Sequence, residues 1–249
     1  MTGGQYISSV MWNKPLKPES YLCHIPAIRY LQAAGSLPLS SQVTCFVGEN
    51  GTGKSTLLEA IAIAYGFNPE GGSRNFSFST NASHSELSEH LILEKRKYAA
   101  DGFFLRAESF YNVASYIDEL DKQPAAAPPI IGGYGGTSLH HQSHGESFLA
   151  LVQHRFGGNG VYILDEPEAA LSPMRLMTLL IEMDRLVKHD SQFIIATHSP
   201  ILMAFPEAEI YEFSEQGIDR VRYEDTEHYR VTKQFMIDHK RIVHQLLEE

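Results

Sequence analysis

The sequence predicts an α/β protein with a mostly parallel sheet that is covered by helices. From residue 42 onwards, short apolar runs rich in β-branched and aromatic residues alternate with longer segments of helical apolar spacing. A glycine-rich stretch joins the first of these runs to a helix, and two later runs end in polar side chains. Because parallel strands need crossover connections, this alternation favours a sheet with helices on its faces.

The length and composition indicate one globular unit. The chain has 249 residues, 43% of them hydrophobic, which is enough to bury a sizeable core. We expect a single domain over residues 1–249, with a core of 1–108 and 146–249. A small helical lobe is expected over about 109–145.

The charge and the two cysteines exclude several classes of protein. A formal net charge of -10 argues against coating of nucleic acid, although a local DNA contact is left open. Cys45 lies in an apolar run, where we expect a buried and inert thiol. With only two cysteines in the chain, a disulfide framework is not expected. No signal peptide or membrane span is recognisable, so we expect a cytoplasmic protein without membrane insertion.

The first half of the chain begins with two loosely alternating segments. Residues 5–12 and 21–30 are expected to pair as an N-terminal antiparallel β flap. A strand at 42–47 and a helix at 55–66 follow, with a glycine loop between them.

The middle of the chain is less regular. Residues 68–85 lack apolar periodicity and predict a loop, whereas 102–107 predict a buried strand and 112–122 a short helix. Proline and glycine clusters within 124–138 indicate a connection rather than a helix or strand.

The second half alternates more regularly, and its last helix places its apolar residues on one stripe. We expect helices over 145–156, 173–189, 200–205 and 227–247, strands over 160–165 and 192–197, and a strand pair near 208–223.

Residues 48–55 read Gly-Glu-Asn-Gly-Thr-Gly-Lys-Ser and match G-x-x-x-x-G-K-[ST] between a strand and a helix. Glycines let successive N–H groups point at phosphate oxygens, and the helix N-terminus adds partial positive charge. Lys54 would reach the β- and γ-phosphates, and the Ser55 hydroxyl would ligate Mg²⁺. The predicted ATP-binding residues are Asn50, Gly51, Thr52, Gly53, Lys54, Ser55 and Thr56.

Two later strands end in polar residues that suit phosphate chemistry. The strand at 161–165 ends in Asp165 and Glu166, where Asp165 would hold Mg²⁺ and Glu166 would polarise the attacking water. Without the glycine loop, such a pair would often be an ordinary loop start. His198 follows the next strand and could reach the γ-phosphate or that water, although a strand-end histidine is usually structural.

A second anion site is predicted at the start of the helix that follows the proline- and glycine-rich connection. The segment contains Ser143, Gly145 and Glu146. The backbone N–H groups at the start of a helix have no partner within the helix, and the Ser143 hydroxyl lies next to them. The first glycine loop does not need this site, so a second nucleotide or a partner is implied. The alternative is an ordinary helix cap at Ser143 with a capping-box acid.

The order and spacing of these motifs resemble the ABC ATPase superfamily, whose signature reads Leu-Ser-Gly-Gly-Gln or Glu. The resemblance covers about residues 42–213 and implies the P-loop NTPase fold of ABC type, with ATP and Mg²⁺ as cofactors. It further implies hydrolysis by Lys54, Glu166 and His198, in an ATP-dependent head-to-tail homodimer where the signature residues contact ATP in trans. Gln142 and His144 depart from the usual Leu and Gly, which leaves the trans contact open.

Three further positions stay open within this resemblance. Ser172 either takes the place of the family's interface Asp or simply caps the next helix. Glu108 is the candidate for the family's lid glutamine and for a further metal contact. Trp12, Tyr21 and Tyr30 are candidates for stacking on adenine.

The biological role is narrowed by what the chain lacks. It has no long coiled-coil insertion, and its context resembles stand-alone ATPases of the DNA-repair and overcoming-lysogenization types. We expect a soluble ATP-driven switch that acts on a protein or DNA-processing partner. The alternatives are the ATP-binding subunit of a membrane transporter and a nucleotide-binding switch with negligible turnover. Basic residues of the last helix could meet DNA, but acidic neighbours favour a solvated amphipathic helix.

Overall fold

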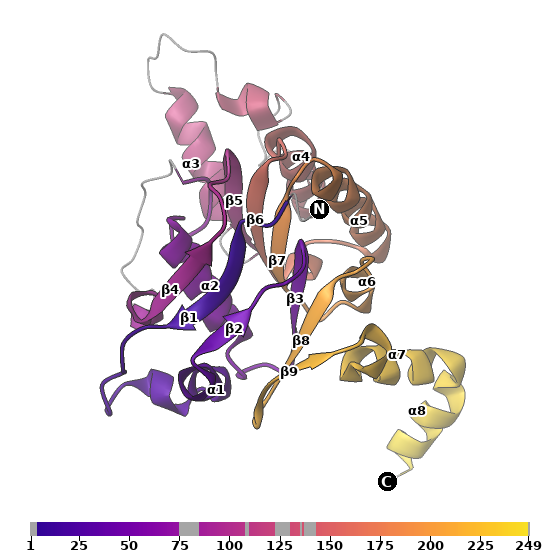
Figure 1. The fold of residues 1–249 in the computed structure, drawn as a ribbon. Coiled ribbons are helices and arrows are strands. Elements are labelled where there is room, and N and C mark those ends of the chain that lie inside the picture. Colours follow the sequence, from indigo (N-terminus) through magenta and orange to yellow (C-terminus); the bar gives the residue numbers. More distant parts are fainter. Residues whose placement is uncertain are drawn as a thin grey trace.

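The computed structural model contains a six-stranded and a three-stranded sheet, with helix α2 (Lys54–Tyr65) packed between them (Figure 1). The structure describes residues 4–74, 85–107, 110–122, 130–134, 136 and 143–248. One hydrophobic cluster fills the space around α2, and a second lies on the other face of the larger sheet.

The larger sheet is mostly parallel, as predicted. Its strand order is β5-β6-β7-β3-β8-β9, and only the β8–β9 pair is antiparallel. The strands that carry the motifs are buried along their whole length because both faces of the sheet are covered. The strands are β3 (Val43–Gly48), β5 (Asp101–Arg106), β6 (Gly160–Asp165), β7 (Gln192–Ala196), β8 (Glu209–Ser214) and β9 (Gly217–Val221).

This order brings the three motif-bearing strands together as neighbours. Strand β7 lies between β3 and β6, and Ala196 at its end pairs with both Phe46 and Asp165. The glycine loop after β3, the acidic pair at the end of β6 and His198 after β7 therefore leave the sheet at one edge. That edge is the carboxyl end of the parallel strands, where open α/β sheets bind ligands.

The N-terminal antiparallel sheet exists, but the second predicted strand is wrong. Strand β1 (Ile7–Trp12) pairs with β2 (Ser36–Pro38) and with β4 (Leu91–Lys95), a strand that the sequence reading missed. Residues 21–30 instead form a 3-10 turn and the start of helix α1 (Pro26–Ala34). Proline at the first helical position, buried residues on one helical face and a left-handed glycine at the C-cap account for the helix.

The helices of the middle and second half follow the prediction closely. They are α3 (Phe110–Lys122), α4 (His144–Arg155), α5 (Pro173–Lys188) and α6 (Pro200–Met203). The predicted loop at 68–85 and the connection at 124–138 lie partly outside the described residues, as does much of the predicted small lobe. The lobe boundaries therefore stay a prediction.

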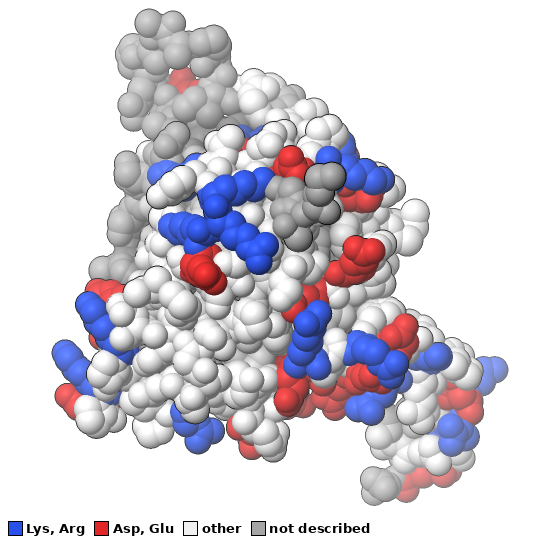
Figure 2. Space-filling view, in the orientation of Figure 1, with Lys and Arg blue, Asp and Glu red and all other residues white. Residues whose placement is uncertain are grey.

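The last predicted helix is two helices, α7 (Glu227–Ile237) and α8 (His239–Leu247). Asp238 leaves the helical conformation and accepts a hydrogen bond from Arg241 N, which starts α8. None of the residues of α7 and α8 is buried, and α8 projects from the body of the protein (Figure 1). Acidic and basic side chains are interleaved over these helices (Figure 2), but large apolar side chains such as Phe235 and Leu247 are exposed on them as well. Within the described part of the chain, no helix has the length and apolarity that crossing a membrane would require.

Candidate functional site

The glycine loop after β3, here called the P-loop (residues 48–55), has a backbone that glycine alone adopts easily. Gly48, Gly51 and Gly53 have φ angles of 125°, 83° and 104°. The loop is also tightly enclosed, since a Cβ on Gly53 would lie 2.5 Å from the Ile25 side chain. Its N–H-rich backbone is thus held in a fixed curve at the start of α2.

Lys54, the first residue of α2, folds back across the P-loop. Its Nζ donates to the carbonyl oxygens of Gly48 and Glu49 at 2.8 and 2.7 Å, and the residue is only 4% exposed. Burial lowers the pKa of Lys54, while the carboxylates of Glu166 and Asp165 act in the opposite direction. These acids favour the charged form of the buried ammonium at the place where phosphates would bind.

Ser55 and Asp165 meet across the gap between α2 and β6. The Ser55 hydroxyl donates to Asp165 Oδ1 at 2.9 Å, so both oxygens face one point. Hydroxyl and carboxylate oxygens are hard donors of the kind that Mg²⁺ prefers, and the pair therefore fits the predicted metal site. Arg106 lies beside it, with Nε 3.5 Å from Asp165 Oδ2 and Nη1 2.6 Å from Glu59 Oε2.

Glu166 and His198 lie opposite each other at the ends of β6 and β7. His198 Nε2 is 3.6 Å from Glu166 Oε1. Glu166 adopts a left-handed conformation with φ 49°, which is uncommon for a residue with a side chain and is typical of functional turns. Burial, then the charges of Lys54 and His228, lower the pKa of His198. Its ring is therefore neutral near pH 7.

Glu168 is a further residue of this site that the sequence reading missed. Its carboxylate accepts hydrogen bonds from the Thr197 hydroxyl at 2.8 Å and from the backbone N–H of His198. Burial raises its pKa above the usual glutamate range. The signal was the third acid of Asp-Glu-Pro-Glu, which follows the assigned pair Asp165 and Glu166. Glu168 ties the segment after β6 to the segment after β7.

The predicted trans residues form a helix cap in the structure. Glu146 accepts from the backbone N–H and the hydroxyl of Ser143 at 3.0 and 2.6 Å, and the hydroxyl bond is the main cause of its lowered pKa. Arg175 of α5 donates to Ser143 Oγ at 3.2 Å and pairs with Glu146 at 3.0 Å. Gly145 is buried against Arg175 and the carbonyl of Ala170. Among described residues, no hydrogen bond or ion pair links Ser143 or Glu146 to the P-loop.

The three open positions have different outcomes. Ser172 caps α5 by accepting from Arg175 N, as one of its two readings expected. Glu108 lies outside the described residues. Of the three aromatic candidates, Tyr21 is 59% exposed, whereas Trp12 stacks on His90 and Tyr30 lies against Gly217.

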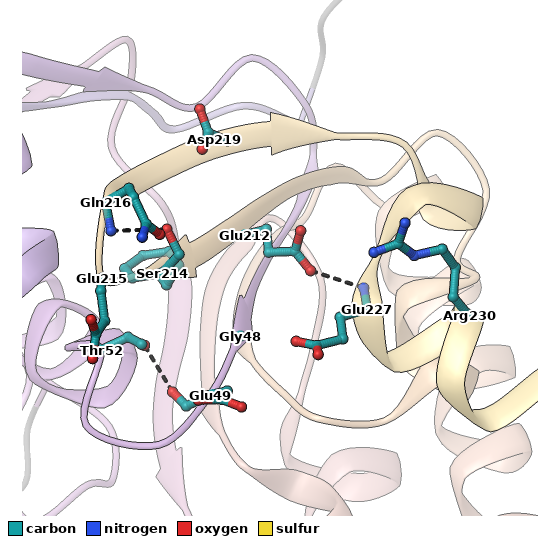
Figure 3. Close-up of a pocket in the computed structure, with 11 residues that line it drawn as sticks. Gly48, Glu49, Thr52, Glu212, Ser214, Glu215, Gln216, Asp219, Glu227 and Arg230 are labelled. Atoms are coloured by element: carbon teal, nitrogen blue, oxygen red, sulfur yellow. Dashed lines mark hydrogen bonds between the residues drawn. The ribbon is translucent and has the colours of Figure 1, made fainter.

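A cavity of about 480 Å³ opens beside the P-loop, between the β8–β9 hairpin and the start of α7 (Figure 3). Its lining is dominated by carboxylates, with a single cation, Arg230, among the lining residues. This charge is unfavourable for a triphosphate. Phosphates are better accommodated on the Lys54 side of the loop. The acidic lining residues are Glu49, Glu212, Glu215, Asp219 and Glu227.

Two family models match the chain. One is described as "AAA domain" and matches residues 23–118, and the other as "AAA domain, putative AbiEii toxin, Type IV TA system" and matches residues 131–204. A search of curated proteins gave no match.

Similar solved structures include ABC transporter proteins and an SMC head domain. An ATP-binding cassette of an ABC transporter is 14% identical, with 94% of this chain and 97% of that chain covered and a TM-score of 0.50. The cbiO1 protein of Clostridium perfringens, part of an ABC transporter complex, is 15% identical, with 98% and 100% covered and a TM-score of 0.49. The SMC head domain from Thermotoga maritima is 17% identical, with 87% and 98% covered and a TM-score of 0.42.

At this level of identity the first of these structures shows a common fold. That fold, the P-loop and the two family matches agree, and they cover both halves of the site. The chain has the P-loop NTPase fold of ABC-type ATPases.

Proposed function

We propose that the protein binds ATP with Mg²⁺ and hydrolyses it at an interface between two copies of the chain. The observation that carries this proposal is the meeting of three strand ends at one edge of the sheet. Lys54, the Ser55–Asp165 pair and the Glu166–His198 pair all lie there. Each group has the chemistry that phosphoryl transfer to water requires.

The residues divide the work by their charge. The P-loop N–H groups and Lys54 would hold the phosphates, which suits a buried ammonium surrounded by carboxylates. Ser55 and Asp165 would hold Mg²⁺, which supplies positive charge to the phosphate oxygens. Glu166 would accept the proton of the attacking water, and a neutral His198 would orient the reacting groups by hydrogen bonding.

The trans contact is supported by the structure of the α4 N-terminus. Ser143 and Glu146 are exposed, so a second molecule can reach them. A carboxylate at this place would repel phosphate, but Arg175 pairs with Glu146 and offsets its charge. Ser143 and Glu146 are therefore proposed to face the ATP that is bound to the P-loop of the other copy, whereas the predicted contact of Gly145 would require its buried backbone to become accessible.

The closure of such a dimer would act as a switch on a protein or DNA-processing partner. The second family match is compatible with action on a cellular target, since its description includes the words "putative AbiEii toxin, Type IV TA system".

Two substitutions test binding and hydrolysis separately. Lys54→Ala should abolish ATP binding measured by calorimetry, because no other described cation replaces the ammonium inside the loop. Glu166→Gln should bind ATP normally but lower steady-state phosphate release by about 10²–10⁴-fold, because an amide cannot accept a proton. Glu19→Gln, at an exposed position, is the matched control.

Three outcomes would contradict the proposal in different ways. Normal turnover in Glu166→Gln would remove the assigned base. ATP binding that survives in Lys54→Ala would move the nucleotide away from the P-loop. Absence of phosphate release from the wild-type chain would leave a nucleotide-dependent switch without hydrolysis.

A further inference from the structure

A second histidine contacts the ring of His198 from helix α7. His228 Nε2 lies 3.0 Å from His198 Nδ1, and the two ring centroids are 5.2 Å apart. Both residues are half-buried. His228 is in the first turn of α7, 30 residues after His198 in the sequence, and it belongs to none of the motifs that identify the fold.

A hydrogen bond between two ring nitrogens needs one donor and one acceptor. If His198 Nδ1 donated, its Nε2 would carry a lone pair and face the carboxylate of Glu166 at 3.6 Å. That arrangement places two acceptors against each other. If His228 Nε2 donates instead, His198 keeps its single proton on Nε2, which can donate toward Glu166 or a phosphate oxygen.

We infer that His228 is a positioning residue that donates to His198 Nδ1 and holds His198 as the tautomer protonated on Nε2. The inference rests on the proposed role of His198 in ATP hydrolysis. A histidine whose partner fixes its tautomer is a recurring arrangement in catalytic and metal sites. Here the partner comes from a C-terminal helix rather than from the core of the sheet.

The surroundings of His228 favour a neutral ring, so that a single N–H proton lies between His228 Nε2 and His198 Nδ1. Burial, then the charge of Lys54, lower the pKa of His228, and the N-terminus of α7 also disfavours a positive ring. The helix is fixed at this end, where the fully buried Thr226 caps it and Glu227 N donates to Glu212 at 3.0 Å. The rest of α7 is exposed or half-buried, so His228 sits at its anchored end.

A matched pair of amide substitutions tests the donor. In His228→Gln the side-chain amide nitrogen can reach the position of Nε2. The Asn side chain is one methylene shorter, so in His228→Asn the amide nitrogen does not reach that position. We expect His228→Asn to lower kcat by about 10- to 100-fold with little change in the KM for ATP, the size of effect seen for hydrogen-bond partners of metal-binding histidines. His228→Gln should keep most of the wild-type kcat, and His244→Asn, at an exposed site on α8, should have no effect.

Equal loss of kcat in the Gln and Asn variants would overturn the inference, because packing and not hydrogen-bond donation would then matter. Wild-type kcat in both variants would overturn it as well.

A second measurement needs neither turnover nor a folded variant of His228. Long-range ¹H–¹⁵N spectra of histidine-labelled wild-type protein report which nitrogen of each ring carries the proton. The His198 signal, assigned by its loss in His198→Gln, should show protonation on Nε2. Protonation on Nδ1, or an even mixture, would overturn the inference. Absence of phosphate release in the wild type would instead refute the proposed hydrolysis and leave this spectral test intact.

Discussion

Gly48 stands where strand β3 becomes the P-loop, and its replacement by alanine should destabilise the fold strongly. Its φ of 125° is a conformation that residues with a side chain rarely adopt. An added Cβ would also overlap the carbonyl oxygen of Phe213 and lie 3.0 Å from its carbonyl carbon. Phe213 is part of β8, which pairs with β3, so relief requires a shift of the sheet backbone.

The expected cost combines two effects. Backbone strain at such a residue costs about 1–3 kcal/mol, and overpacking of a buried site costs a further ~1–3 kcal/mol. Gly48→Ala should therefore lower the free energy of unfolding by about 2–6 kcal/mol. Gly51 provides the control, because its φ is 83° but nothing lies within 4 Å of its added Cβ. Gly51→Ala should cost only ~1–2 kcal/mol.

Urea unfolding followed by circular dichroism measures both values on the same protein. The m-value should not change, since neither substitution alters how much surface is exposed on unfolding. Equal losses in the two variants would show that backbone strain alone decides the effect. A Gly48→Ala variant as stable as the wild type would contradict the close approach of β8 to the P-loop.

The remaining predictions concern stability away from the phosphates. Burial alone would raise the pKa of Asp101, but Arg155 at 2.7 Å, the Gly157 N–H and the Tyr162 hydroxyl outweigh it and hold the pKa below its usual range. The stabilisation is therefore complete above the unfolded value of about 3.9 and is lost as pH falls through the lower folded value. Asp101→Asn should be less stable than wild type near pH 7, with a difference that shrinks on acidification, and a difference independent of pH would refute this. Ser172→Ala should lower the free energy of unfolding by about 1 kcal/mol through the lost α5 cap, while Ser172→Asp keeps it. Unchanged stability in Ser172→Ala would favour the interface reading of this residue.

The sequence was most informative where a motif is local. The P-loop motif predicts its own strand, turn and helix. Its glycines, lysine and serine all lie within residues 48–55, between the end of β3 and the first turn of α2. Once three apolar strands are placed in one parallel sheet, their polar ends must meet at one edge. That geometry follows from topology and needs no detailed packing.

The predictions failed where partners are distant in sequence or where two patterns overlap. Apolar and polar residues alternate loosely over 21–30, which resembles a strand. However, Pro26 is typical of the first position of a helix and Gly35 of a helix C-cap, and this signal was overlooked. Strand β4 needs β1 as its partner, 79 or more residues away, and no local pattern announces that pairing. Asp238 splits the last helix because its side chain caps the following turn.

Two of the missed site residues, unlike Glu168, have the same origin. Arg106 and His228 reach the site only through the tertiary fold, from the end of β5 and from α7. Neither lies in a recognisable motif, so spacing along the chain could not nominate them.

The most direct test of the central claim is the solution mass of Glu166→Gln by light scattering, with and without Mg-ATP, repeated with Ser143→Arg added. Circular dichroism and ATP binding to the intact P-loop of the double variant show that it is folded. A mass that doubles only with Mg-ATP, and that stays monomeric once Ser143 is replaced, is the result predicted for a head-to-tail dimer closed by ATP. A mass that never changes, or that doubles equally in both proteins, would contradict the trans role of Ser143 and the composite site.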